Sequence, residues 1–293
     1  MNKILISICL FCLSFTQSYS QEEDLLAVLD SMDNEQETEH ITGTFKSIRL
    51  INGYTSEIPA RKELIFTISH RFLRINSGVE SLYGLDQATI RFGFDYGFND
   101  RLAIGIGRSN NRDIVDGYLK YKLFRQASGK NSFPFTVTFL EGVAVRTQKW
   151  QNNSIDYPFS ARLNYVHELF ISRKFNENLS LQLSPVIVHR NIVEKNEDQN
   201  LVPAIGFGAR YKITPRFCLN GEYYYLLPGQ TAKDFSNSLS LGVSIQTGGH
   251  VFQLHFSNSR GMTEKLFIPE TTGNWFEDDI YFGFNIIRLF SFR

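Results

Sequence analysis

The sequence predicts an all-β protein: an up-and-down antiparallel transmembrane β-barrel of about 12 strands, with a short N-terminal periplasmic segment. The clearest observation is the stretch ATIRFGFDYGF at residues 88–98, in which apolar side chains alternate with polar or very small ones. A period of two is typical of a strand with one apolar and one polar face. The other two observations are an N-terminal export signal and linkers that alternate between short and long.

The first 20 residues have the features of a signal peptide. Lys3 gives a positive start, residues 4–15 form an apolar run, and Ser18 and Ser20 supply small side chains before a cleavage site at Gln21. The run is too short to cross a bilayer as a helix. We therefore expect export to the outer membrane of a Gram-negative bacterium. The chain divides into a signal peptide, a periplasmic segment and a barrel: residues 1–20, 21–62 and 63–293.

Residues 21–62 differ in composition from the rest of the chain. Residues 21–40 carry eight acidic and no Lys or Arg residues, and four apolar residues between positions 25 and 32 have helical spacing. A short amphipathic helix and a disordered acidic tail are both compatible with this pattern. Residues 41–62 are irregular, because Gly53 and Pro59 interrupt any long element.

The strands are predicted by side chains that alternate from residue 64 to the C-terminal region. Every second residue is predominantly apolar, and the residues between are mostly polar or small. In chain order the apolar faces run from Leu64 to Phe72, Ala88 to Phe98, Leu102 to Ile106, Leu119 to Leu123, Phe135 to Val145, Phe159 to Ile171, Leu179 to Ile187, Ile205 to Ile213, Phe217 to Tyr225, Leu239 to Ile245, Phe252 to Phe256 and Ile280 to Ile286.

The linkers form two sets. The short set, rich in turn residues, is 99–100, 126–132, 176–178, 214–215 and 248–249. The mostly longer set is 74–86, 109–114, 148–156, 190–201, 228–237 and 259–277. Short periplasmic turns opposite longer outer loops, with both termini in the periplasm, are typical of outer-membrane barrels. Because open strand edges are not tolerated in lipid, residues 280–292 should pair with residues 63–73.

Alternation alone does not say whether the apolar face meets lipid or a core, because soluble barrels and sandwiches alternate too. Small residues on the wet faces, and apolar faces nearly free of charge over about ten residues, favour lipid. If the apolar faces pointed inward, a barrel of this strand number would need a wide apolar core to fill it, which also favours lipid-facing apolar side chains. We expect Phe92, Phe94, Leu241, Val243, Phe282 and Phe284 to face lipid, and Arg91, Asp95, Ser240 and Asn285 to face the lumen. A secreted β-rich binding protein is the alternative.

Residues 44–52 (TFKSIRLIN), 68–72 (ISHRF), 84–108 (GLDQATIRFGFDYGFNDRLAIGIGR) and 116–126 (DGYLKYKLFRQ) resemble an uncharacterised family of Gram-negative outer-membrane β-barrels, a domain of unknown function. The resemblance covers nearly all of the mature chain. It implies a barrel of this size, and it implies no activity, substrate or catalytic residue.

The charged residues of the predicted wet faces are the candidate functional residues. Eight basic residues stand against four acidic ones: Arg71, Arg91, Lys120, Lys122, Arg146, Arg162, Arg210 and Lys212 against Asp95, Asp116, Glu168 and Glu222. One interpretation is a narrow channel whose basic lumen admits small anionic solutes. The other is a closed structural barrel filled by internal salt bridges. We further hypothesise that part of residues 21–62 enters or caps the lumen, drawn by opposite charge; a solvated tail is the alternative.

An enzyme is the weaker hypothesis. His255 and Ser257 share a strand face, as in a membrane-embedded hydrolase acting on lipid, but parity places them on the wet face and no third group nearby orients the histidine. His70, His167 and His189 have no metal-ligand spacing, and we expect no metal and no cofactor. Balanced charge (30 basic, 30 acidic) gives no reason to expect nucleic acid. Cys218 alone remains after residue 20, so the mature chain has no intramolecular disulfide. We expect a monomer in outer-membrane lipid.

Overall fold

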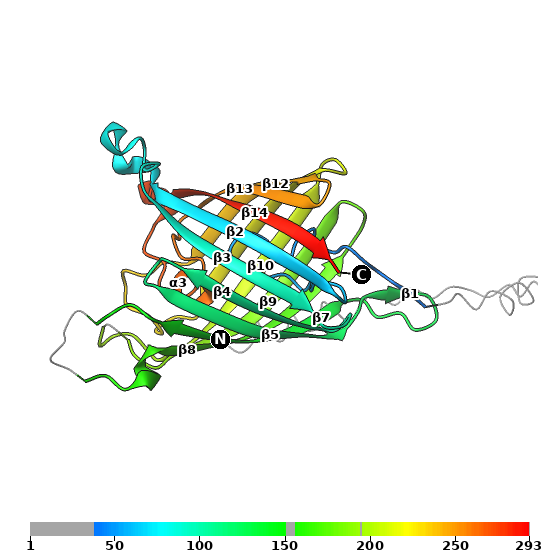
Figure 1. Cartoon of the computed structure of the whole chain (residues 1–293), viewed down its shortest axis with the longest axis horizontal. Coiled ribbons are helices and arrows are strands. Elements are labelled where there is room, and N and C mark those ends of the chain that lie inside the picture. The colour runs from blue at the N-terminus through cyan, green and yellow to red at the C-terminus, as the bar shows by residue number, and fades with distance from the viewer. Residues whose placement is uncertain (1–37, 151–155, 194, 293) are drawn as a thin grey trace, which may run out of the picture.

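The computed structural model describes residues 38–150, 156–193 and 195–292. The predicted signal peptide and the acidic residues 21–37 lie outside these described residues. Twelve antiparallel strands close into a barrel, which confirms the predicted fold class (Figure 1). The strands are β2 (Glu63–Arg74), β3 (Ala88–Gly97), β4 (Leu102–Ser109), β5 (Ile114–Phe124), β7 (Thr136–Arg146), β8 (Leu163–Lys174), β9 (Leu179–Arg190), β10 (Leu201–Lys212), β11 (Phe217–Leu226), β12 (Ser238–Thr247), β13 (His250–Ser257) and β14 (Tyr281–Ser291).

The barrel closes where β14 pairs with β2, as the sequence predicts. Phe290 lies opposite Leu64, and Phe284 lies opposite His70. The register shifts once between Tyr281 and Gly283. The pairing leaves no open edge in the barrel, which a lipid environment requires because unpaired backbone groups have no water to bind there.

The two ends of the barrel differ, as the linker lengths predict. The short-turn end carries the start of β2 and the end of β14, at the right of Figure 1. Beyond it projects a two-stranded sheet of β1 (Glu39–His40) and β6 (Ala127–Ser128), so linker 126–132 is more than a turn. The long-loop end carries the 3-10 helices η1 (Ile75–Ser77), η2 (Val79–Ser81), η3 (Phe159–Arg162) and η4 (Trp275–Glu277) and the short helix α3 (Glu264–Phe267).

Two strand boundaries differ from the alternation pattern. The predicted strand starting at Phe159 begins at Leu163, because η3 follows Pro158, whose ring fixes its φ at −62°. The strand predicted from Leu119 begins at Ile114. Ile114 turns an apolar side chain inward against Leu266 of a loop inside the barrel, and a single-strand pattern cannot show that contact.

None of the helices among the described residues is long and apolar enough to cross a membrane. The strands alternate instead: on β3, Phe92 and Phe94 are exposed while Arg91 and Asp95 are buried. The other residues predicted to face lipid or the lumen follow the same pattern. Leu241 is exposed and Val243, Phe282 and Phe284 are half-exposed, whereas Ser240 and Asn285 are buried.

Candidate functional site

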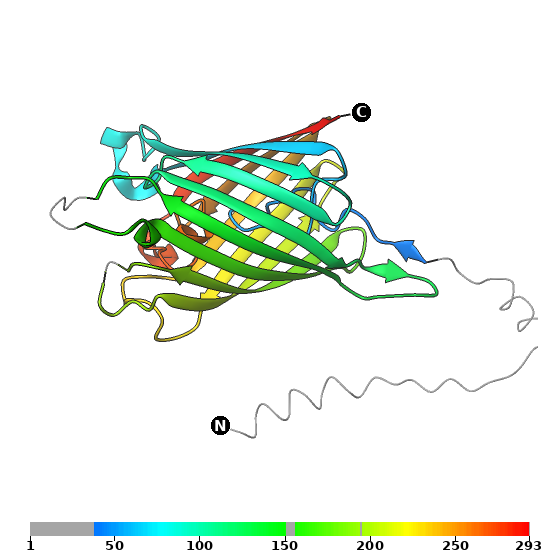
Figure 2. The same cartoon turned by 60° about the horizontal axis from the view of Figure 1, so that its bottom comes forward.

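Residues 45–57, here the inner hairpin, lie inside the barrel. They enter from the short-turn end, ahead of β2 (Figure 2). The Leu50 N–H donates to the Gly53 carbonyl and the Thr55 N–H to the Ile48 carbonyl, each at 2.9 Å, so the chain reverses at Ile51 and Asn52. Most of these residues are fully buried. These residues belong to the irregular part of the segment 21–62, and they are an ordered part of the barrel interior.

Glu222 of β11 binds the tip of the inner hairpin. Its carboxylate accepts the backbone N–H groups of Ile51, Asn52 and Gly53 at 3.2, 2.8 and 3.1 Å. Three consecutive amides therefore meet one buried charge. Hydrogen bonds to an ionised acceptor are among the stronger ones in proteins.

The Asn52 side chain extends this attachment. Its Oδ1 accepts from Arg71 Nε and Nη2 of β2 at 3.1 and 2.7 Å, and its Nδ2 donates to Ser240 Oγ of β12 at 3.0 Å. Asn285 Nδ2 of β14 donates to the Ile51 carbonyl at 3.0 Å. The tip is thus held from several sides of the barrel.

The returning arm of the inner hairpin binds the opposite wall. Lys120 Nζ of β5 donates to the carbonyls of Thr55 and Glu57, the latter at 2.6 Å. Gln182 of β9 donates to the Tyr54 carbonyl and accepts the Ser56 N–H, both at 2.9 Å. Among the described residues, hydrogen bonds reach the hairpin from nine strands: β2, β5, β7, β8, β9, β11, β12, β13 and β14.

A second segment, residues 258–280, extends from the long-loop end; we call it the inner loop, and its first part, residues 258–271, folds inward, while residues 276–278 stay exposed. Its helix α3 is buried, and Phe267 packs edge-on against Tyr224 of β11 with ring centroids 5.1 Å apart. Phe267 shares one apolar cluster with Tyr54 of the inner hairpin. Arg49 Nη1 of the hairpin lies 3.8 Å from Glu264 Oε1 of the inner loop. The two inserted segments therefore meet inside the barrel.

The contact between the segments is tight and polar. The cavity bordered by Tyr54, Glu264 and the walls of β5 and β7 has only about 20 Å³, roughly the space of one water molecule. The Arg49 guanidinium stacks 3.7 Å above the Tyr54 ring. Burial raises the pKa of the Glu264 carboxyl, against the opposing effect of Arg49. Burial also raises the pKa of the Tyr54 phenol above its usual range.

The twelve charged residues predicted on the wet faces separate into two groups. Eight are fully buried in the barrel and balance in charge: Arg71, Arg91, Lys120 and Arg210 against Asp95, Asp116, Glu168 and Glu222. The other four are half-buried at the two ends: Lys122, Arg146, Arg162 and Lys212. The basic surplus counted from the sequence thus lies at the mouths of the barrel. The end of β9 adds the buried Arg190, and the loops add further buried charges, including Asp198, Glu264 and Lys265.

Most of the buried charges have local partners. Arg91 forms a bidentate pair with Asp116, with Arg91 Nε 3.0 Å from Asp116 Oδ1. Tyr118 donates to Asp95, and Tyr224 donates to Glu168 at 3.3 Å. Arg210 donates to the Gly43 carbonyl at 3.4 Å. At the short-turn end, Lys122 pairs with Glu57 and Lys212 with Glu177, each at 3.4 Å.

The histidine and serine residues of β13 do not form a catalytic pair. Ser257 Oγ accepts from Ser240 Oγ at 2.9 Å, and within the described residues neither ring nitrogen of His255 makes a hydrogen bond. A nucleophile needs a base within hydrogen-bond reach. His167 binds Glu141 on the outer surface, and His70 stacks on Phe284. In the part of the chain described by the structure, no group of three metal-ligating side chains could hold an ion.

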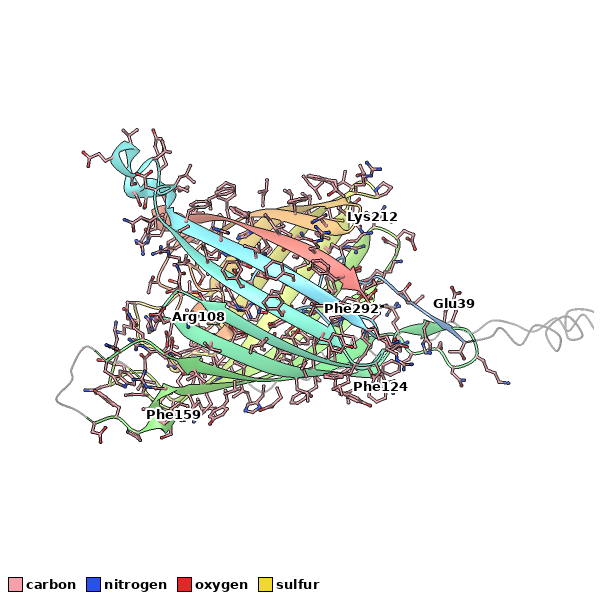
Figure 3. The ribbon with its side chains drawn as sticks, viewed as in Figure 1. Glu39, Arg108, Phe124, Phe159, Lys212 and Phe292 are labelled. Carbon is pink, nitrogen blue, oxygen red and sulfur yellow. The ribbon has the colours of Figure 1, made fainter. Side chains whose placement is uncertain are left out.

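A pocket of about 420 Å³ opens at the long-loop end. Arg146 and Arg162 line it, with Trp150, Lys265 and Glu270. Figure 3 shows Phe159, in the η3 segment that also contains Arg162, at this end, whereas Lys212 and Phe292 lie at the other. The alternation pattern places both arginines on a wet face but cannot show that they meet, because they belong to β7 and η3.

Sequence analysis identifies neither the exact residues nor the contacts of the inner hairpin and the inner loop, for a common reason. Neither has a strand or helix period, and their partners lie far away in the chain: Asn285 and Ile51 are 234 residues apart. The hypothesis that part of residues 21–62 enters the lumen is based on the acidic residues 21–40, of which 21–37 lie outside the described residues. The part of that segment described inside the barrel, residues 45–57, carries Arg49 and offers backbone amides to Glu222.

The family described as "Membrane bound beta barrel domain (DUF5777)" matches residues 45–290. None of the curated proteins matches the chain. Among solved structures, the NanC porin is 10% identical (TM-score 0.48; 78% of this chain and 99% of that chain covered). The KdgM porin is 8% identical (0.46; 79% and 99%), and LpxR from Salmonella typhimurium is 12% identical (0.38; 78% and 100%). The family match includes the inner hairpin together with the strands.

Proposed function

This chain belongs to the membrane-bound β-barrel family DUF5777, and from that premise we propose that it is an outer-membrane barrel whose narrow conduit is closed at rest by the inner hairpin. The expected signal peptide at residues 1–20 supports export, and the twelve-stranded closed barrel is of the kind that spans outer membranes. The protein conducts when the hairpin withdraws toward the short-turn end.

One observation carries this proposal: the barrel wall that faces the hairpin is hydrophilic. Arg71, Lys120, Gln182, Glu222 and Asn285 all bind the hairpin from the wall. A permanently closed interior gains little from buried charges, since well-packed apolar residues of similar volume are often as stabilising or more so. A wall that must also face water needs such side chains.

The route of the hairpin supports withdrawal. Residues 41–43 lead in and residues 58–62 lead out at the same end of the barrel, and several of these residues are exposed. Non-covalent contacts alone hold residues 45–57, so the hairpin can leave without breaking the pairing of the twelve strands. The inner loop narrows the conduit that remains.

Small anionic solutes are the proposed cargo. Of the twelve charges predicted on the wet faces, the eight fully buried ones balance, and the four other residues, all basic, lie at the two mouths. Arg146 and Arg162 are at the long-loop end, and Lys122 and Lys212, which pair with Glu57 and Glu177, are at the short-turn end. Rings of positive charge at a constriction lower the barrier for anions. We therefore expect modest anion selectivity in the open state.

Planar-bilayer conductance of refolded protein tests the proposal. Deleting residues 45–57 should produce steady anion-selective currents, while the full chain stays mostly closed. Deleting residues 21–37 is the matched control, because it shortens the N-terminal segment but leaves the hairpin seated. Both variants must show heat-modifiable, protease-resistant barrels. A folded 45–57 deletion that conducts no better than the full chain would mean a structural barrel and overturn the proposal.

A further inference from the structure

A groove of about 520 Å³ lies at the long-loop end of β11 and β12, and its volume is in the range of small-molecule sites. Tyr223 and Leu239, which lie opposite each other on the outward-facing sides of these strands, line its base. Residues 227–237, which connect the two strands, and residues 274–276 of the inner loop line the rest. None of the residues that line the groove belongs to the inner hairpin, so the closed conduit does not account for it.

Most polar side chains of the groove already have partners within the protein. Asn237 Nδ2 donates to Tyr223 Oη at 2.8 Å, and Asn258 Nδ2 donates to the Asn237 carbonyl at 2.8 Å. The indole Nε1 of Trp275 donates to the Leu239 carbonyl at 2.9 Å. A polar ligand would have to compete with these bonds. What the groove offers a ligand is therefore mainly the carbon surface of its aromatic and aliphatic side chains.

Phe276 stands at this groove with its side chain almost completely in the open, at 98% exposure. The turn that carries it is ordered by Asn274, whose Oδ1 accepts the Phe276 N–H at 3.0 Å and whose carbonyl accepts the Glu277 N–H at 3.2 Å. Leu227, also in the groove lining, is 37% exposed. Contiguous exposed apolar surface of this kind marks an interaction site.

The groove continues the outer surface of the barrel, and this continuity identifies the occupant. Leu239 is followed on the same face of β12 by the exposed Leu241, and Tyr225 is exposed on the same face of β11 as Tyr223. This outer surface is the one that faces lipid in a membrane-bound barrel. An acyl chain can therefore pass from the bilayer into the groove and remain in contact with apolar surface throughout, which the hydrophobic effect favours.

We propose that the groove binds one acyl chain of a membrane lipid, taken from the leaflet that surrounds the long-loop end. The chain packs along Tyr223 and Leu239 and is covered by Phe276. The hydroxyl groups of Thr231 and Ser236 and the exposed ammonium group of Lys233 are polar groups of the same lining that remain for the headgroup. The site is independent of the gate, because it shares no residue with the inner hairpin.

Lipid that stays with the extracted protein is the direct readout. The full chain is refolded into vesicles of dioleoylphosphatidylcholine, extracted with a mild detergent and weighed by native mass spectrometry, which should show one phospholipid per chain. Phe276→Ala should lower the retained lipid about tenfold, because burial of its ring contributes to binding. Leu227→Ala should lower it severalfold. Phe159→Ala is the matched control, since Phe159 is 67% exposed at the same end (Figure 3) but lies outside the groove.

The two tryptophans of the chain locate the retained lipid. In Trp150→Phe, extraction from vesicles of the same lipid brominated in mid-chain should leave Trp275 quenched. In Trp275→Phe, Trp150 should stay as bright as after extraction from unbrominated vesicles. All variants must give heat-modifiable, protease-resistant barrels. Absence of retained lipid, equal retention in Phe276→Ala and Phe159→Ala, or equal quenching of the two tryptophans would overturn the proposal. Displacement of the lipid by maltose would identify a sugar site and would overturn it as well.

Discussion

The carboxylate of Glu222 accepts the backbone N–H of Asn52 at 2.8 Å, across 170 residues of sequence. This contact joins the wall of the barrel to the tip of the inner hairpin. It also places a buried carboxylate where three amides, and not a cation, provide the nearest hydrogen bonds. The hairpin amides therefore replace water around the Glu222 carboxylate, and the carboxylate in turn provides the acceptor that these buried amides need.

Glu222→Gln should loosen the inner hairpin. The amide can offer only one acceptor oxygen, so at least one buried N–H loses its partner, at a cost of about 1–3 kcal/mol. That shifts the balance between seated and withdrawn hairpin by about tenfold to a hundredfold. Trypsin should then cut after Arg49, which is buried in the parent, and bilayer leak should rise. Glu177→Gln, in an exposed turn, is the control. Parent-like resistance of Glu222→Gln to trypsin would contradict this role.

Gly53→Ala should push the hairpin outward without removing any hydrogen bond. A Cβ at this position would lie 2.1 Å from Tyr224 Oη and 3.0 Å from its Cζ. Conductance and cleavage after Arg49 should both increase. Adding Tyr224→Phe removes the closest atom and should reverse part of the effect. If the double variant leaks as much as Gly53→Ala alone, steric contact with Tyr224 is not the cause.

Asp116→Ala should destabilise the barrel by about 3–5 kcal/mol, because it leaves the buried Arg91 guanidinium without its carboxylate. Arg91→Met combined with Asp116→Leu should recover most of the lost free energy of unfolding, since apolar residues of similar size need no charged partner. Urea titration of the barrel in lipid vesicles measures both. Asp234→Ala, which breaks the exposed pair with Lys195, should change stability little. Similar losses in the single and double variants would argue against a desolvation cost.

Phe94→Arg should cost about 2–4 kcal/mol if the outer surface of β3 faces the middle of the bilayer. Phe94 is exposed and stacks with Phe66 of the neighbouring strand at 4.8 Å. Phe98→Arg, just after the end of β3, should cost about 0–1 kcal/mol, because charges are tolerated near the interface. Vesicle-based urea titration compares the two. Equal losses of stability at both positions would contradict the placement of Phe94 near the middle of the bilayer and of Phe98 near its surface.

The sequence alone was enough to predict the barrel. Alternate residues on a strand point to opposite faces whatever else surrounds them, so Phe94 outside and Asp95 inside follow from a local property of the chain. Strand number, closure of the first strand on the last, and the two kinds of linker follow from the same period. The start of β5 shows the limit of this argument: Ile114 points inward like Asp116, but the apolar partner that it meets there, Leu266, cannot be read from the strand pattern.

Only the tertiary structure decided what fills the barrel. Residues 45–57 carry no period, and their attachment uses backbone amides and carbonyls that every sequence has. Composition therefore does not show which residues of the segment 21–62 lie inside the barrel or what binds them. The sequence also does not show where along the barrel axis each charged side chain lies. Arg91 pairs with Asp116 inside the barrel, whereas Arg146 and Arg162 both pack on Trp150 at the long-loop end. Period determines which way a side chain points, and long-range contacts determine what it meets.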